Sequence, residues 1–319
     1  MRIDFHTRSL ARRDFLKASV ALLGLPMFSL AFPAATRRPL LSFSTLACPD
    51  WSFAEIMDFA ANNHYDGIEM RGILQELELA KCVEFNSKEN ILSTMKKMQD
   101  RQLRFSDLGT SAALHHAEPA LRRKNLDEAK RYIDLAQQLA CPYIRVFPNE
   151  LPREQERETT ITLITEGLIE LGKYAEGSDV SVLMESHGEL TIAADLEYIM
   201  RSAAHSQVGL IWDVINMWSV TKESPVDVYA KLKKYIHHVH LKDMSLINDK
   251  QRYVLLGKGQ TPIFEAVDVL YRDGYRGYYS FEWEKRWHPE IEEPEIALAD
   301  YAKVMRAYFA NLDGLKAVE

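Results

Sequence analysis

The chain has 319 residues, of which 47% are hydrophobic and 27% are charged, and its formal net charge is −7. These proportions are typical of a globular protein and exclude a chain that is disordered as a whole. Three cysteines in this length exclude a disulfide-stapled mini-protein, and 14 glycines with 12 prolines exclude a collagen-like or low-complexity architecture. The length allows one large α/β barrel or two smaller domains.

The first 35 residues have the pattern of an export signal. Residues 9–17 read SLARRDFLK, and an apolar run, ASVALLGLPMFSLAF, follows before small residues that end at Ala35. A basic start, a short apolar run and small residues at the exit are typical of a signal peptide that is removed. The core Arg12-Arg13-x-Phe15-Leu16-Lys17 resembles the twin-arginine signal of bacteria, so the twin-arginine export machinery is an expected partner. We predict a signal peptide over 1–35, a folded domain over 36–319 and a periplasmic location.

A membrane anchor is the alternative interpretation of this segment. The apolar run has about 15 residues and contains Gly24 and Pro26, whereas a spanning helix needs roughly 20 apolar residues. The run is therefore too short for a stable membrane anchor, and we expect no stable membrane insertion once the signal is cleaved. Cleavage can fall after Ala31 or after Ala35.

The charge of the predicted mature domain bears on its partners. Without residues 1–35 the chain keeps 34 basic and 44 acidic residues, which gives a net charge of −10. Nucleic-acid binding is largely the neutralisation of phosphates by Lys and Arg, so no nucleic-acid partner is expected. The sequence leaves a homo-oligomer open.

Beyond residue 36, apolar runs of strand length alternate with segments of helical periodicity. The predicted strands are 40–45, 65–72, 103–109, 143–148, 180–186, 208–214, 236–243 and 277–284. The predicted helices are 53–63, 121–139, 159–178, 193–203, 226–235, 263–274 and 294–311. Ser52 is expected to cap the first of these helices, and Thr261-Pro262 to supply the cap and first-turn residue of the sixth.

This alternation predicts an α/β fold, a (β/α)8 TIM barrel, because eight strands alternate with helices over about 280 residues. A doubly wound open sheet is the competing layout. No GxGxxG follows an early strand, so the dinucleotide-binding form of that sheet is disfavoured.

An ionisable side chain lies at the end of each of the last four predicted strands: Glu185, Asp213, His240 and Glu282. In a barrel all four would reach the C-terminal face, where active sites are built. Three carboxylates and one imidazole suit one divalent metal ion; Mn²⁺ is favoured, with Mg²⁺, Co²⁺ or Zn²⁺ as alternatives. A single acid at a strand end is usually a helix cap or a solvated charge, so the prediction depends on four consecutive strands.

Two neighbouring residues compete for these positions. His238 shares a strand face with His240, because side chains alternate along a strand. His240 is favoured because it is nearer the strand end. Glu284 shares a strand face with Glu282 and is the alternative to it.

Five motifs together point to a known family: YDGIEMRG, MESHG, WDVIN, HHVHLKD and GKGQTPIF…LYRDGYRGYYSFEWE. Through them the chain resembles the xylose-isomerase-like barrel family, the sugar phosphate isomerases/epimerases, from about Leu40 to about Asn311. Members such as ketohexose 3-epimerases and inosose dehydratase bind one divalent metal ion through Glu, Asp, His and Glu. The resemblance implies that Glu185, Asp213, His240 and Glu282 are the metal ligands, and that the two glutamates are also the catalytic acid/base pair.

The chemistry of such a site leads to a first hypothesis about function. A bound cation polarises the carbonyl of a keto sugar and makes the proton on the neighbouring carbon acidic. A carboxylate removes that proton, and its return at another position isomerises or epimerises the sugar. Because phosphorylated sugars are cytoplasmic intermediates, an exported enzyme is expected to act on an unphosphorylated sugar or a glycoside. We therefore predict a metal-dependent sugar isomerase/epimerase.

Three other functions stay open at this point. A β-eliminating lyase acting on a 3-keto-glycoside, or a dehydratase, would use the same metal site. A non-catalytic sugar-binding barrel is the alternative from another class, and the presence of both Glu185 and Glu282 argues against it. A nuclease like the AP-endonuclease branch of the family is disfavoured by the acidic charge and the export signal.

Six residues are predicted to bind the substrate. His187 and Asn216 follow two predicted ligands, although ordinary turn polarity explains them equally well, and Arg145 and Lys242 can contact hydroxyls or carboxylates. Lys258 is a further candidate for such a contact and is not counted among the six. Trp287 and His288 belong to the charged loop WEKRWHPEIEEPE, which follows the last strand. Asn216 stands where the epimerases commonly place a substrate-contacting histidine, so their substrate does not carry over. Trp212, Trp218, Trp283 and Trp287 can supply sugar-stacking walls, although core packing explains most of them equally well. Only Trp287, in the loop, is counted among the six.

Overall fold

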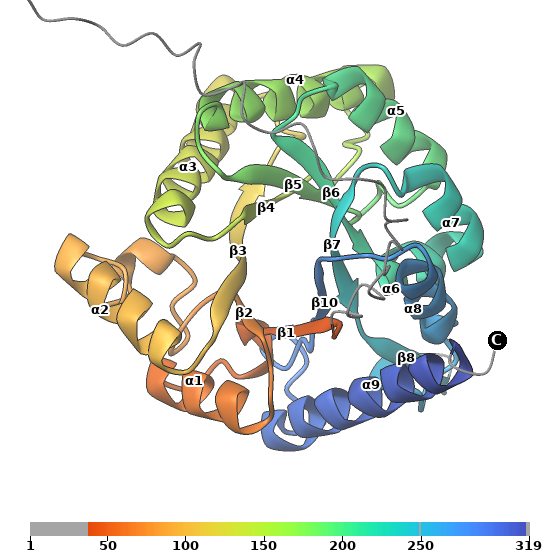
Figure 1. Cartoon of the computed structure of the whole chain (residues 1–319). Coiled ribbons are helices and arrows are strands. Elements are labelled where there is room, and N and C mark those ends of the chain that lie inside the picture. Colours follow the sequence, from red (N-terminus) through yellow and green to blue (C-terminus); the bar gives the residue numbers. More distant parts are fainter. Residues whose placement is uncertain (1–37, 249, 317–319) are drawn as a thin grey trace, which may run out of the picture. The chain divides into compact units, whose positions relative to one another are not determined.

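A closed ring of eight parallel strands forms the centre of the computed structural model, which describes residues 38–248 and 250–316. The strands are β1 (Leu40–Ser44), β2 (Gly67–Met70), β3 (Arg104–Ala113), β4 (Tyr143–Phe147), β5 (Ser181–Glu185), β6 (Val208–Asp213), β7 (Ile236–Leu241) and β10 (Tyr278–Phe281). They follow one another in chain order, and the ring closes where β1 pairs with β10. Figure 1 shows the helices surrounding this ring. The predicted (β/α)8 barrel is confirmed.

The helices cover the outside of the barrel. They are α1 (Phe53–Asn62), α2 (Lys88–Asp100), α3 (Pro119–Gln138), α4 (Arg157–Ala175), α5 (Ala193–Ala203), α6 (Val214–Thr221), α7 (Pro225–Leu232), α8 (Ile263–Arg272) and α9 (Pro294–Lys316), with short 3-10 turns η2 (Thr45–Ala47) and η3 (Leu79–Lys81). All seven predicted helices are present, whereas α2 and α6 were not predicted. None of the described helices is long and apolar enough to cross a membrane. The predicted signal peptide lies outside the described residues, so the boundary at residue 36 stays a prediction.

Helix α1 begins with a capping box, as Ser52 led us to expect. The Ser52 hydroxyl accepts a hydrogen bond from the backbone N–H of Glu55, and the Glu55 carboxylate accepts one from the backbone N–H of Ser52. These two bonds satisfy donors that have no partner within the helix. The expected cap of α8 is wrong: the helix begins at Ile263 with Pro262 as N-cap, and the Thr261 hydroxyl has no hydrogen-bond partner.

Replacing Ser52 with alanine is expected to lower the free energy of unfolding by about 1 kcal/mol, because the cap bond to Glu55 is lost. Urea unfolding followed by circular dichroism measures the change. Ser219→Ala is the control, because its hydroxyl donates to a carbonyl at the far end of a helical turn and caps no N-terminus. Equal losses for the two variants would contradict the capping role.

A β-hairpin interrupts the barrel pattern after β7. It pairs β8 (Asp243–Ile247) with β9 (Lys250–Val254), so the predicted strand over 236–243 extends too far. The Asp243 carboxylate accepts the backbone N–H groups of Met244, Gly257 and Gly259. Asp243 therefore ties the segment that follows the hairpin back to the end of β7.

The interior of the barrel is polar, in contrast to its wall. Glu69 on β2 bonds to His240 on β7, and Arg145 on β4 lies 3.6 Å from a carboxylate oxygen of Glu282, which follows β10. Because these strands are not neighbours in the ring, such contacts can form only across its interior. The buried polar residues on the strands or at their ends include Ser42, Ser44, Glu69, Arg71, Asp107, Arg145, Glu185, Asp213, His238, His240, Lys242, Ser280 and Glu282. The aliphatic core lies between the strands and the helices.

Candidate metal centre and active site

The four predicted metal ligands meet at the C-terminal end of the barrel. Glu185 and Asp213 are the last residues of β5 and β6, His240 is the penultimate residue of β7, and Glu282 directly follows β10. All four are at most 3% exposed. One nitrogen or oxygen atom from each lies within 4.8 Å of those of the other three. Strand register explains part of this convergence, since Asp213 pairs with His240.

The donor atoms of this group fit a divalent cation. The Nδ1 atom of His240 lies 3.5 Å from Oε1 of Glu185 and 3.4 Å from Oε2 of Glu282, and it is buried without a hydrogen-bond partner. A buried imidazole nitrogen aimed at carboxylate oxygens is an available ligand atom. Three carboxylates with one imidazole favour cations of intermediate hardness. The chain therefore has a candidate metal centre, and the metal roles of the four residues stay predictions.

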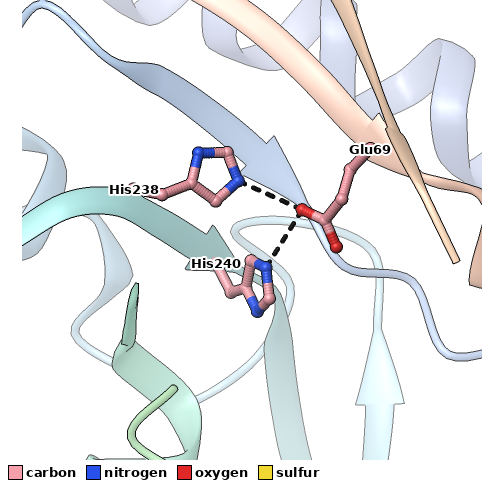
Figure 2. A group of neighbouring side chains, drawn as sticks. All are labelled: Glu69, His238 and His240. Carbon is pink, nitrogen blue, oxygen red and sulfur yellow. Dashed lines mark hydrogen bonds and ion pairs between the residues drawn. The ribbon is translucent and has the colours of Figure 1, made fainter. Parts of the chain in front are cut away.

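Glu69 orients the imidazole of His240, and sequence reasoning missed it. One oxygen of Glu69, Oε2, lies 3.0 Å from Nε2 of His240 and 3.1 Å from Nε2 of His238 (Figure 2). The same oxygen accepts the Ser280 hydroxyl at 2.9 Å. Burial raises the pKa of Glu69, but the two histidines outweigh burial and hold it well below its usual range. An ionised carboxylate only accepts hydrogen bonds, so Nε2 of His240 carries a proton and Nδ1 is the nitrogen that faces the metal centre. Burial lowers the pKa of His240, but Glu282, Glu69 and Glu185 outweigh burial and hold it well above its usual range, so a cation that binds there displaces a proton from Nδ1.

Glu69, His238 and His240 form a second group whose ligand atoms lie within 4.8 Å of one another. Their hydrogen bonds to one carboxylate oxygen account for this proximity without a cation. A carboxylate inside the apolar motif YDGIEM was the available signal for Glu69. Asp107, paired with Glu69 in the strand register, is also buried, and burial together with Glu69 raises the pKa of Asp107 well above its usual range.

Arg145 was predicted to bind substrate, and the structure places it between the two glutamates. Its Nη1 donates to Oε2 of Glu185 at 2.9 Å and lies 3.6 Å from Oε1 of Glu282. Its Nη2 donates to the carbonyl of Thr110, and its guanidinium stacks on the Phe147 ring at 4.0 Å. Arg145 is thus a buried counter-ion for the pair of glutamates.

Lys242 was also predicted to bind substrate, and its ammonium group is 1% exposed among three carboxylates. It donates to Asp213 at 2.8 Å, to Glu282 at 2.6 Å and to Glu284 at 2.7 Å. Glu284, the rival of Glu282, is therefore near the centre but outside the four-ligand group. Burial raises the pKa of Glu282, but His240, Lys242 and Arg145 outweigh burial and hold it well below its usual range. Glu282 is ionised at neutral pH.

Two further predicted substrate residues lie on the rim beside the centre. Asn216 donates from its backbone to Asp213, the N-cap of α6, and its amide lies 3.5 Å from Oε1 of Glu185. The His187 ring lies 4.7 Å from the Phe147 ring, and its Nδ1 is 3.0 Å from Oδ1 of Asn149. Both side chains are in reach of the ligand-bearing strand ends.

The residues of the loop over 283–295 agree only in part with their predicted roles in substrate binding. His288 packs edge-on against Tyr253, whose hydroxyl bonds to Glu284, so a chain of contacts links it to Lys242. Trp287 is 51% exposed beside Arg286. Trp212 and Trp283 are buried in the core against Tyr229 and Phe281, so for these two the core-packing alternative holds and a sugar-stacking role does not.

We expect metal affinity to rise with pH. Burial raises the pKa of Asp213 to about 7, against opposition from Lys242. Below pH 7 a cation must displace this proton, so affinity falls by roughly tenfold for each pH unit. The same shift means that Asp213 destabilises the metal-free protein increasingly between about pH 4 and pH 7. Calorimetric titration with Mn²⁺ at pH 6, 7 and 8 tests this, and equal affinities at pH 6 and 8 would contradict it.

The chain is similar to known proteins in sequence and in fold. The chain is 25% identical to the 3-dehydroshikimate dehydratase of Bacillus anthracis over 235 residues, which is 68% of this chain and 78% of that protein. Its fold resembles the 3-keto-D-glucoside 4-epimerase of E. coli, with a TM-score of 0.67 and 14% identity over 85% of this chain and all (100%) of that one. It also resembles the IOLI protein solved with a bound zinc atom, with a TM-score of 0.69 and 16% identity over 84% and 97% of the two chains.

A family model covers most of the barrel. Residues 57–308 match the model described as the xylose isomerase-like TIM barrel. This range contains every residue of the candidate metal centre. The chain therefore belongs to the xylose isomerase-like TIM barrel family.

Proposed function

We propose that this protein is a metal-dependent enzyme that removes the proton next to a carbonyl group of an unphosphorylated sugar and thereby isomerises or epimerises it. The observation that carries the proposal is the convergence of Glu185, Asp213, His240 and Glu282 within 4.8 Å at the C-terminal end of the barrel. A divalent cation bound there would polarise the substrate carbonyl. The similarity to a sugar epimerase and to a zinc-containing barrel supports this proposal.

The carboxylates of the chain would perform the proton transfers. Glu185 and Glu282 face the same nitrogen of His240 from different strands, so a substrate carbon placed between them meets an acceptor on each side. One glutamate takes the proton to give an enediolate, and either glutamate returns it. Arg145 and Lys242 keep both groups ionised and ready to accept. Asn216 and His187 are placed to orient substrate hydroxyls.

The proposed periplasmic location limits the range of possible substrates. The twin-arginine pattern at Arg12-Arg13 supports export to the periplasm. Sugars there are unphosphorylated, so a free sugar or a glycoside is the proposed substrate. Mn²⁺ is the proposed metal, since the donor set combines hard oxygens with one imidazole.

β-Elimination is a second candidate, and the dehydratase relative favours it. The same proton abstraction would expel a hydroxyl or a glycosidic oxygen at the carbon β to the carbonyl. The two reactions leave different products: an isomer of unchanged mass, or an unsaturated ketone that absorbs in the ultraviolet.

Deuterium uptake tests the proposal. The Mn²⁺-loaded protein is incubated in D₂O with a panel of ketohexoses and 3-keto-glycosides, and products are analysed by NMR and mass spectrometry. Proton abstraction followed by reprotonation predicts an isomer that carries deuterium at one carbon next to the carbonyl, which supports the isomerase/epimerase. β-Elimination takes the proton from that carbon without returning one, so an enone, which carries no deuterium there, supports the lyase. Turnover that gives neither a deuterated isomer nor an enone would rule out both.

A further inference from the structure

A buried guanidinium lies beside the candidate centre without a carboxylate partner. Arg71 directly follows β2 and is 6% exposed. Its Nη2 donates to the Ser111 hydroxyl at 2.8 Å, whereas its buried Nη1 has no hydrogen-bond acceptor. Among residues 38–248 and 250–316, Arg71 forms no ion pair within 4.0 Å. Few buried donors in native structures are without a partner, so Nη1 of Arg71 is a donor that a bound ligand would satisfy.

Arg71 is in close reach of the catalytic carboxylates. A Cβ atom added to Gly109 on β3 would lie 2.8 Å from Cδ of Arg71 and 3.1 Å from Nη2 of Arg145. The two arginines therefore pack side by side over this glycine. Arg145 contacts Glu185 and Glu282 through its other nitrogen, so Arg71 is separated from the candidate centre by one side chain.

The backbone holds Arg71 in this position. The Thr45 hydroxyl accepts the backbone N–H groups of Arg71 and Gly72 and donates to the carbonyl of Gly72. Ser111, to which Nη2 donates, is exposed, so the Arg71 side chain ends next to a residue that solvent reaches. The fold therefore fixes the backbone position of Arg71, while Nη1 of its side chain has no hydrogen-bond acceptor.

Without a ligand, this arrangement is electrostatically unfavourable. Burial and the neighbouring Arg145 lower the pKa of Arg71 to about 10, so it is still charged at neutral pH. Two adjacent buried cations repel each other, and Glu185 compensates only Arg145 directly. Glu128 is an acid that favours the charged form of Arg71, but its Oε1 accepts the backbone N–H of Ser111. A bound anion would relieve the repulsion.

We propose that Arg71 binds a carboxylate group of the substrate, so that the substrate class of this site is a keto sugar acid. The inference rests on the proposed function, because it takes the reacting carbonyl to lie at Glu185 and Glu282. A planar carboxylate matches the fork of a guanidinium and compensates its charge, whereas a sugar hydroxyl supplies an acceptor without charge.

Two sugars that differ at a single carbon test the proposal. D-Fructuronate is D-fructose with a carboxylate in place of the C6 hydroxymethyl group. Calorimetric titration of the Mn²⁺-loaded protein is expected to show D-fructuronate binding about tenfold or more tightly than D-fructose. Arg71→Gln is expected to remove this preference. Arg101→Gln, which removes the same charge from a partly exposed pair with Asp58, is expected to keep it.

The outcomes separate this inference from the proposed function. Equal binding of the two sugars, no measurable binding of D-fructuronate, or a preference that survives Arg71→Gln would overturn the carboxylate subsite, even if deuterium uptake supports proton abstraction. A preference that depends on Arg71 would support the subsite even if no sugar exchanges deuterium. Tighter binding of D-fructose 6-phosphate than of D-fructuronate would overturn the assignment to a carboxylate.

The melting temperature of an Arg71 variant distinguishes a ligand-binding role of Arg71 from a packing role. Arg71→Met removes a buried charge that repels Arg145, so the ligand-free variant is expected to melt at a higher temperature than the wild type while it loses the preference for D-fructuronate. A lower melting temperature together with an unchanged preference would assign Arg71 a structural role instead.

Discussion

Replacing Glu282 with glutamine is expected to lower turnover by about a thousandfold once a substrate is identified. The amide cannot accept the proton that the carboxylate would take, and it removes one of the four anionic or imidazole ligands of the candidate centre. It also leaves the buried ammonium of Lys242 with one carboxylate fewer. The measurement is steady-state kinetics at saturating Mn²⁺, which separates lost chemistry from weaker metal binding.

Glu284→Gln is the matched control for this experiment. Glu284 also accepts a hydrogen bond from Lys242, but its oxygens are not among the four ligand atoms of the centre. We expect this variant to keep turnover within about tenfold of the wild type, since it loses a contact to Lys242 and no proton acceptor. Equal losses in the two variants would contradict the assignment of Glu282. Unchanged sugar binding and turnover in Glu282→Gln would instead favour a non-catalytic sugar-binding barrel.

Glu69→Gln is expected to weaken metal binding by about tenfold to a hundredfold, although Glu69 is not a ligand of the four-residue centre. Glutamine would replace an ionised acceptor that fixes the protons of His238 and His240 with a neutral amide. Nδ1 of His240 would then no longer be held free for the cation, and the imidazole could turn. Calorimetric titration with Mn²⁺ measures the loss.

Ser280→Ala separates orientation of the imidazole from packing around Glu69. It removes one donor from the same oxygen of Glu69 but leaves both imidazoles bonded, so metal affinity is expected to stay within about threefold of the wild type. Nitrogen-15 NMR of the Zn²⁺-loaded protein provides a second readout, because the ring nitrogen of His240 that carries the proton is expected to change in Glu69→Gln and to persist in Ser280→Ala. An unchanged His240 spectrum in Glu69→Gln would refute the orienting role.

The sequence was sufficient to predict the barrel and the convergence of its strand ends. Each strand is a short apolar run with a polar residue at its end, and parallel strands bring those ends to one face. Asp213 and His240 are paired in the register of β6 and β7, so their proximity follows from the architecture alone. The same reasoning placed Glu185 and Glu282 on this face.

Contacts across the barrel interior could not be predicted in this way. Glu69 and His240 are 171 residues apart and lie on strands that are not neighbours, so no local pattern relates them. Helix α2 was missed because its buried residues are few and one of them is a threonine. The hairpin after β7 was missed because its strands are largely polar and exposed. The wrong role for Trp283 arose because position in a loop motif does not reveal burial.

The charged interior of this barrel has a consequence for attempts to engineer heat resistance. Buried ion pairs can often be replaced by well-packed apolar side chains with no loss, or even a gain, in stability. Selection for thermal tolerance alone would therefore favour hydrophobic substitutions at positions such as Glu69, Arg145 and Lys242. Such variants would be more stable but inactive, so a screen of this barrel has to measure catalytic activity together with thermal stability.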